Sequence, residues 1–122
     1  MPFLFFTTIW YNGSMTKVKI KSGACGNVTN VEAVSEDGTE VILNVDSGCA
    51  AIVKMFEELG DTFDAYQLCF SKPGSGPLYE YTSKAEKYPP HGGCPVVAGV
   101  VKAVEAECKL AMVQDASITF EQ

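Results

Sequence analysis

The chain has 122 residues, of which 47% are hydrophobic and 20% are charged. This composition is typical of one globular domain with a single core, and it excludes an intrinsically disordered chain. The formal net charge of −6 argues against nucleic acid as a partner, because nucleic-acid binding depends on clustered Lys and Arg.

The N-terminal segment is strongly apolar from Met1 to Tyr11, but it lacks the basic region and the cleavage site of a signal peptide. It is also too short to span a bilayer, so we expect no membrane partner and a cytoplasmic protein. Because the pattern changes abruptly at Met15, we interpret residues 1–14 as an extension upstream of the natural start. The alternative is an extra edge strand. Residues 15–122 are expected to form a single cysteine-containing domain.

The next part of the chain has the two-residue period of β-strands. Between residues 16 and 22, apolar side chains alternate with three lysines, which predicts a half-buried strand with a solvated face. Two more strands, at 28–34 and 39–45, are predicted on either side of Asp37-Gly38, a pair that strongly favours a hairpin turn. These three strands would form an antiparallel meander.

Helical spacing begins at residue 48, and the apolar pattern predicts a helix over 48–59 and a shorter one within 61–69. Residues 78–88 are compatible with another short helix. Pro95 suits the first position of a long helix that begins at Cys94. Alternation over 116–120 predicts a last strand. The expected fold is therefore α+β, with a three-stranded antiparallel meander plus a C-terminal strand, packed against two main helices.

The chain has five cysteines, an odd number that disfavours a disulfide framework. Three of them occupy positions that favour the thiolate, the form of cysteine that binds metals. Cys25 lies in a glycine-containing turn, Cys49 in the first turn of the predicted helix, and Cys94 at the start of the long helix, where the helix dipole is positive. We therefore predict that Cys25, Cys49 and Cys94 converge as metal ligands. The alternative is that each is a small core residue.

The remaining cysteines and the only histidine are less clearly assigned. Cys108 completes the apolar stripe of the long helix and is expected in the core. Cys69 ends a predicted helix before a Pro/Gly loop, and His91 lies three residues before Cys94. Either Cys69 or His91 could be a fourth ligand. A fourth thiolate would hold zinc or an iron–sulfur cluster tightly, whereas a neutral imidazole would give a more exchangeable site.

The three predicted ligands lie in the segments Ala24-Cys25-Gly26-Asn27-Val28, Ser47-Gly48-Cys49-Ala50-Ala51-Ile52 and Pro89-Pro90-His91-Gly92-Gly93-Cys94. Over residues 20–110 this order resembles the iron–sulfur scaffold proteins of the IscU type, equivalent to the N-terminal domain of NifU. The resemblance implies an IscU/NifU-like fold, cysteine ligation of a cluster, and a sulfur donor or cluster-accepting protein as partner. The family has Asp in place of Asn27, where it helps to keep the cluster labile, and His in place of Gly93. Because of these two differences we favour Cys69 over His91 as the fourth ligand. The chain also resembles a small uncharacterised prokaryotic family with a His-x-x-Cys-Pro-Val segment.

These observations predict a metal- or iron–sulfur-cluster-binding protein of the scaffold or carrier type. Zinc on the same ligands is the nearest alternative, because thiolates suit both. A second alternative is a thiol enzyme or sulfur acceptor, with Cys94 as nucleophile and His91 as base. A third is a metal-free interaction domain. The sequence contains no complete catalytic motif, so an enzyme is the less favoured class.

Overall fold

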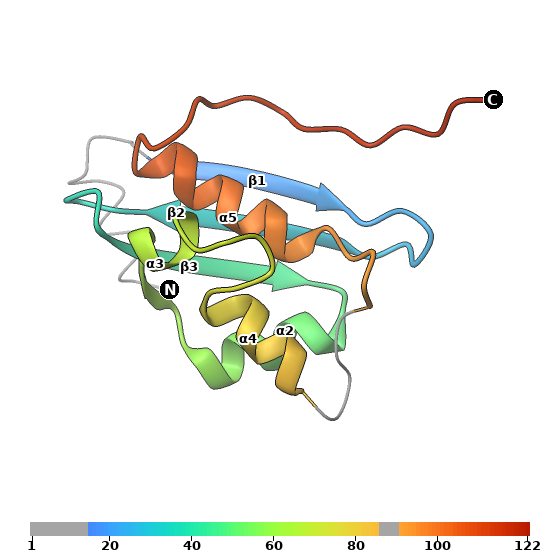
Figure 1. Cartoon of the computed structure of the whole chain (residues 1–122), viewed down its shortest axis with the longest axis horizontal. Coiled ribbons are helices and arrows are strands. Elements are labelled where there is room, and N and C mark those ends of the chain that lie inside the picture. The colour runs from blue at the N-terminus through green and yellow to red at the C-terminus, as the bar shows by residue number, and fades with distance from the viewer. Residues whose placement is uncertain (1–14, 86–90) are drawn as a thin grey trace.

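A computed structural model describes residues 15–85 and 91–122. The expected α+β class is confirmed: the described residues form a four-stranded antiparallel sheet in the order β1-β2-β3-β4, together with four helices (Figure 1). The strands are β1 (Thr16–Lys21), β2 (Val28–Val34), β3 (Glu40–Ser47) and β4 (Thr62–Asp64). The helices are α2 (Ala50–Leu59), α3 (Ala65–Cys69), α4 (Pro77–Lys84) and α5 (Val96–Glu107).

The meander gives the sheet two distinct ends. At one end, Lys21 of β1 pairs with Val28 of β2, and β3 finishes there at Ser47. We call this the Lys21 end. At the other, the Thr16 end, β1 begins and the hairpin between β2 and β3 turns through Gly38, which has a φ of 78°. Asp37 Oδ1 fixes this turn by accepting hydrogen bonds from the backbone N–H groups of Thr39 and Glu40.

The fourth strand differs from the expectation. Residues 116–120 are exposed and adopt no strand, so the predicted C-terminal strand is wrong, and β4 supplies the fourth strand instead. Alternating residues form a strand only where a neighbouring strand satisfies their backbone groups, and within the described structure this segment has no such neighbour. Asp64 ends β4 and caps α3, because its Oδ1 accepts hydrogen bonds from the N–H groups of Tyr66 and Gln67.

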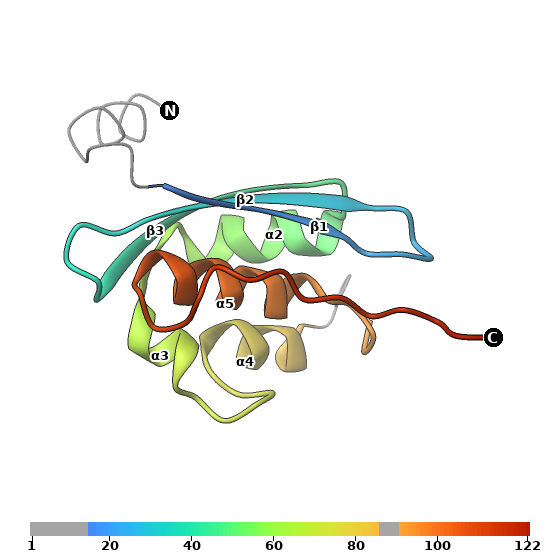
Figure 2. The ribbon, with the colours of Figure 1, turned by 90° about the horizontal axis from the view of Figure 1, so that it is seen from above.

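The four helices all cover one face of the sheet, as Figure 2 shows from above. The core lies between these layers and contains fully buried residues from both. They include Val31 and Val41 from the sheet, Ile52 and Met55 from α2, and Val100 and Val104 from α5. The two main helices of the prediction, α2 and α5, are therefore confirmed.

Helix α5 runs antiparallel to β1 and spans both ends of the sheet. Gly99, near its beginning, lies against Ile20 at the Lys21 end. Glu107, its last residue, accepts a hydrogen bond of 2.8 Å from the Thr16 hydroxyl and one of 3.0 Å from the backbone N–H of Ser35. Any residue just before α5 is therefore carried to the Lys21 end.

The close approach of α5 to β1 depends on a residue without a side chain. A Cβ at Gly99 would lie 2.6 Å from Ile20 Cγ1 and also overlap Ile20 Cδ1. We expect Gly99→Ala to lower the free energy of unfolding by about 1–3 kcal/mol, because overpacking forces side chains off their rotamers. Urea denaturation followed by circular dichroism measures the change. Gly92→Ala is the control, because no atom lies within 4 Å of its Cβ position. Equal stability of the two variants would contradict this packing.

Among the helices in the part of the chain that the structure describes, none is long and apolar enough to cross a membrane.

Candidate metal centre

Cys25 lies in the turn between β1 and β2, at the Lys21 end of the sheet. The turn is closed by the hydrogen bonds from Ser22 N to Asn27 O and from Gly26 N to Gly23 O. Gly23 and Gly26 have positive φ values of 90° and 76°, and no atom lies within 4 Å of the Cβ position of either. The Cys25 side chain is exposed. The turn therefore presents a thiol outside the packed core.

Cys49 lies at the same end, where it is the N-cap residue of α2. Its backbone N–H donates a hydrogen bond of 3.1 Å to Ser47 Oγ, and the Ser47 hydroxyl is 2.7 Å from that of the buried Thr29. Two neighbouring strands therefore hold the residue that precedes α2. The thiol is half-buried beside the first turn of the helix.

Asn27 links the Cys25 turn to the Gly48-Cys49 turn. Its side-chain amide donates a hydrogen bond of 3.6 Å to Cys25 Sγ. Its Oδ1 lies 3.0 Å from the position that a Cβ at Gly48 would occupy. The same side chain therefore contacts the first thiol and packs on the residue next to the second.

Cys94 also lies toward the Lys21 end, because it precedes Gly99 by five residues and Gly99 packs on Ile20. Its backbone N–H donates a hydrogen bond of 3.0 Å to His91 O, so residues 91–94 form a turn just before α5. The N-cap of α5 is Pro95, one residue later than predicted. Cys94 is half-buried, and the His91 side chain is exposed.

Figure 1 shows these three segments at the same end of the molecule: the β1–β2 turn, the start of α2 and the loop before α5. Within the described residues, however, no three His, Cys, Asp or Glu side chains are close enough to share a metal ion. The predicted ligands Cys25, Cys49 and Cys94 thus lie at one end without forming a closed metal site. Pro89 and Pro90 of the third segment lie outside the described residues.

Cys69 lies at the opposite end, so its assignment as fourth ligand is corrected. Helix α3 begins with a hydrogen bond from Ala65 N to Thr39 O, which places it beside the start of β3. Burial, followed by the charges of Glu105 and Cys108, raises the pKa of the Cys69 thiol to about 12. These two neighbours lie on and just after the last turn of α5, far from Cys94. Sequence alone did not reveal this, because the packing of α3 on α5 is a tertiary contact.

Cys108 is a core residue, as predicted, with 8% of its side chain exposed. Burial raises the pKa of this thiol, the charges of Glu107 and Asp37 raise it further, and a hydrogen bond with Ser35 partly opposes them. The cysteines therefore divide into two groups. Cys69 and Cys108 are protonated packing residues at the Thr16 end, whereas Cys25, Cys49 and Cys94 lie toward the other end.

This division predicts the order in which the thiols are alkylated. With iodoacetamide at neutral pH, Cys25 should react fastest because it is exposed, and Cys69 and Cys108 slowest because they are shielded and protonated. Peptide mass spectrometry over a time course measures the five rates. Labelling of Cys69 at the rate of Cys25 would contradict the assignment.

The same pKa gives the sign of a pH effect on folding. The Cys69 thiol has an ordinary value of 9.0 and a folded value of about 12, so the folded state holds its proton more tightly. Its contribution to stability is complete below pH 9 and is lost as the pH rises toward 12.

The fold and the site together define a small α+β protein with free thiols from three chain segments at one end of an antiparallel sheet. The chain belongs to DUF6951, a family of unknown function, whose family model matches residues 16–120. No curated protein and no solved structure matches it significantly.

Proposed function

We propose that the Lys21 end of the domain binds a thiophilic metal, either as an iron–sulfur cluster or as zinc, through Cys25, Cys49 and Cys94. The observation that carries this proposal is the common location of three free cysteines from separate segments, none of which is fully buried. Core cysteines, such as Cys108, behave differently in the same chain.

The donor set suits this class of ligand. Thiolates are soft ligands that favour iron–sulfur clusters and zinc over magnesium or calcium. Helix α2 supplies a fixed thiol at its N-cap, and the amide of Asn27 already donates to Cys25 Sγ, as the outer-shell groups of metal sites commonly do.

Closing the site requires the three cysteines to approach one another, and the Cys25 turn is a segment that can move. The turn has two glycines with positive φ, Gly23 and Gly26, whose Cβ positions contact nothing. Its displacement would therefore disturb little packing. Asn27 already joins this turn to the start of α2, because its amide donates to Cys25 Sγ and its Oδ1 lies 3.0 Å from the position that a Cβ at Gly48 would occupy.

His91 is the fourth ligand that fits this end of the molecule. It belongs to the same turn as Cys94, and its Nδ1 lies 3.9 Å from the Cβ position of Gly93. A neutral imidazole in place of a fourth thiolate would give a more exchangeable site and would raise the potential of a cluster. This property suits a protein that passes its cargo to a partner.

The resemblance to IscU-type scaffolds supports the scaffold or carrier role. It covers the sequence around all three cysteines, and it implies a sulfur donor or a cluster-accepting protein as partner. If the site holds an iron–sulfur cluster, a sulfur donor or a cluster-accepting protein would reach the Cys25 thiol first, because Cys25 is exposed and Cys49 and Cys94 are half-buried.

The test is anaerobic reconstitution of the full chain, followed by an absorption spectrum and metal analysis. Visible sulfur-to-iron charge-transfer bands with stoichiometric iron and sulfide support a cluster, and stoichiometric zinc supports the zinc form. Binding of neither would overturn the proposal. It would leave the thiol enzyme, with Cys94 as nucleophile and His91 as base, or the metal-free interaction domain.

A further inference from the structure

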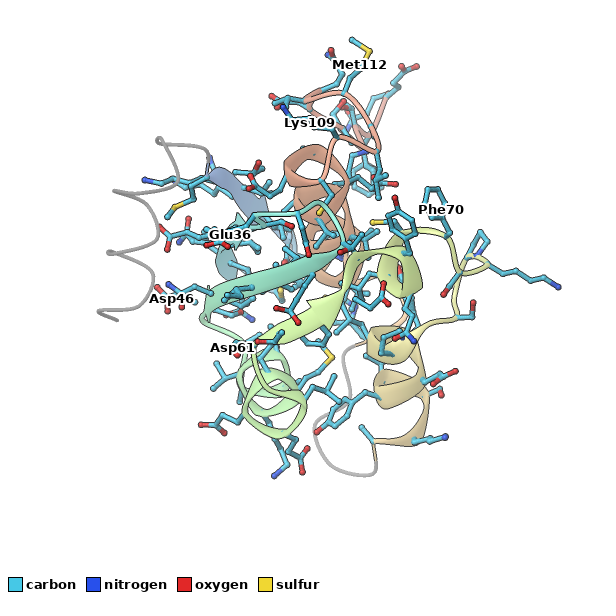
Figure 3. The ribbon with its side chains drawn as sticks, turned by 90° about the vertical axis from the view of Figure 1, so that its left-hand side faces the viewer. Glu36, Asp46, Asp61, Phe70, Lys109 and Met112 are labelled. Carbon is cyan, nitrogen blue, oxygen red and sulfur yellow. The ribbon has the colours of Figure 1, made fainter. Side chains whose placement is uncertain are left out.

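The C-terminal tail, residues 111–122, is exposed along its whole length. It leaves α5 through Lys109, which has a positive φ of 60°, and then extends past the helix without joining the sheet (Figures 1 and 2). Figure 3 shows Lys109 and Met112 at the point where the tail departs. Its large apolar side chains are almost completely solvated: Ile118 is 90% exposed and Phe120 is 96% exposed.

The tail nevertheless has the pattern of a half-buried strand. Ile118 and Phe120 alternate with Ser117 and Thr119, and these residue types, except serine, are favoured in strands. The tail also lies within the shared family domain, whose match extends to residue 120. A segment of this kind, exposed on a single chain, indicates an interaction surface.

The strand that this pattern fits is β1. In the described part of the protein β1 pairs only with β2, so its other edge has backbone groups for a further strand. Val18 and Ile20 point toward the helix layer. Val18 is half-buried, and Ile20 is buried. The exposed side chains of Lys17, Lys19 and Lys21 line the opposite face. Lysines on an edge oppose pairing with a basic strand, whereas an acidic residue opposite one of them stabilises the pair.

We propose that residues 117–122 of one copy pair antiparallel with β1 of a second copy, and that the exchange is reciprocal. The register places Ile118 opposite Ile20 and Phe120 opposite Val18. Both apolar side chains of the tail then join the helix-covered face. The same register places Glu121 opposite Lys17, on the lysine face.

The direction of the tail favours a second copy over the chain's own β1, because a parallel pair of strands is slightly less stable per residue than an antiparallel pair. The tail runs in the same direction as β1 of its own chain (Figure 1), so pairing within one chain would be parallel. A two-fold axis perpendicular to the strands reverses the direction of β1 in the second copy relative to the tail of the first. The tail and that strand are then antiparallel. Such an exchange uses both edges and both tails, so it closes as a dimer instead of forming a filament. It is independent of the proposed metal site.

Sedimentation velocity of the full chain, under reducing conditions with a chelator, tests the proposal. We expect a concentration-dependent dimer, and we expect Ile118→Asp/Phe120→Asp to be a monomer at every micromolar concentration tested. These side chains are exposed in the single chain, so the changes should not affect its folding. Val113→Asp is the control, because Val113 is also an exposed apolar residue of the tail, 81% exposed, but lies outside the paired segment.

Charge reversal tests the register. Glu121→Lys should raise the dimer dissociation constant about four- to 25-fold, as expected for the two equivalent cross-strand pairs of a reciprocal dimer, and adding Lys17→Glu should restore it. A wild-type chain that stays monomeric would overturn the proposal, and so would a dimer unchanged by Ile118→Asp/Phe120→Asp. Hydrogen exchange that shows a protected tail in the monomer would assign the tail to its own sheet and would also overturn it.

Discussion

Replacing Cys49 by serine is expected to reduce the bound metal to background after anaerobic reconstitution. Cys49 is firmly positioned, because its N–H donates to Ser47 Oγ at the start of α2 and the Ser47 hydroxyl is hydrogen-bonded to that of the buried Thr29. A serine hydroxyl in its place is a hard ligand that stays protonated, so it does not replace a thiolate on a soft metal. The loss should exceed the ~10–100-fold that changes to outer-shell residues cause.

The chain offers a matched control for this experiment. Cys69→Ser is the same chemical change at the Thr16 end, beside Glu105 and Cys108, and it should leave metal content unchanged. His91→Ala should weaken binding without abolishing it, because three thiolates remain. Metal analysis of the three variants, after identical reconstitution, gives the comparison. Loss of metal in Cys69→Ser with full retention in Cys49→Ser would reverse the assignment of the site.

Replacing Glu107 by alanine is expected to lower the free energy of unfolding by about 2–3 kcal/mol, since a buried donor that loses its acceptor bears a desolvation penalty. Glu107 is buried, with 6% of the residue exposed. It joins three elements, because it belongs to α5 and accepts hydrogen bonds from Thr16 of β1 and from Ser35 just after β2. Removing it leaves the N–H of Ser35, a residue that is 2% exposed, without its acceptor.

Urea denaturation measures this effect, with Glu58→Ala on the exposed side of α2 as the control. Glu107→Gln should be intermediate, because the amide can accept from Ser35 and donate to the Thr16 hydroxyl, but neutral hydrogen bonds are weaker than those to a carboxylate. A change of less than about 0.5 kcal/mol in Glu107→Ala, the range of ordinary surface substitutions, would show that the carboxylate does not hold these elements together.

The local part of the fold was predictable from sequence. Asp37-Gly38 marked the hairpin, and the change from a two-residue to a helical period located α2. Strand β4 was missed because three residues are too few for a periodic pattern, although Asp64 is a residue type that commonly caps helices. Residues 116–120 were predicted to form a strand because their apolar and polar side chains alternate. Alternation is a property of the segment alone, whereas a strand also needs a neighbouring strand to pair with.

The candidate site was also predictable only where local sequence order determines it. The order of turns and helix starts was sufficient to place Cys25 and Cys49 at one end of the sheet, because an antiparallel meander returns the chain to the same end. The position of Cys94 also depends on the packing of α5 on β1. The position of Cys69 depends on how α3 packs against the last turn of α5. No local sequence pattern encodes that contact. Asn27 was noted in the sequence only as a departure from the IscU pattern. Its contacts with Cys25 and Gly48 depend on the tertiary structure.

The central claim is that Cys25, Cys49 and Cys94 share one metal or cluster. A crystal structure of the anaerobically reconstituted protein, with anomalous scattering recorded at the edge of the bound metal, tests it most directly. The account predicts an anomalous peak at the Lys21 end, with metal-to-sulfur distances of about 2.3 Å to these three cysteines and His91 as the remaining ligand. A peak beside Cys69 and Cys108, or one that contacts fewer than two of the three proposed cysteines, would contradict it.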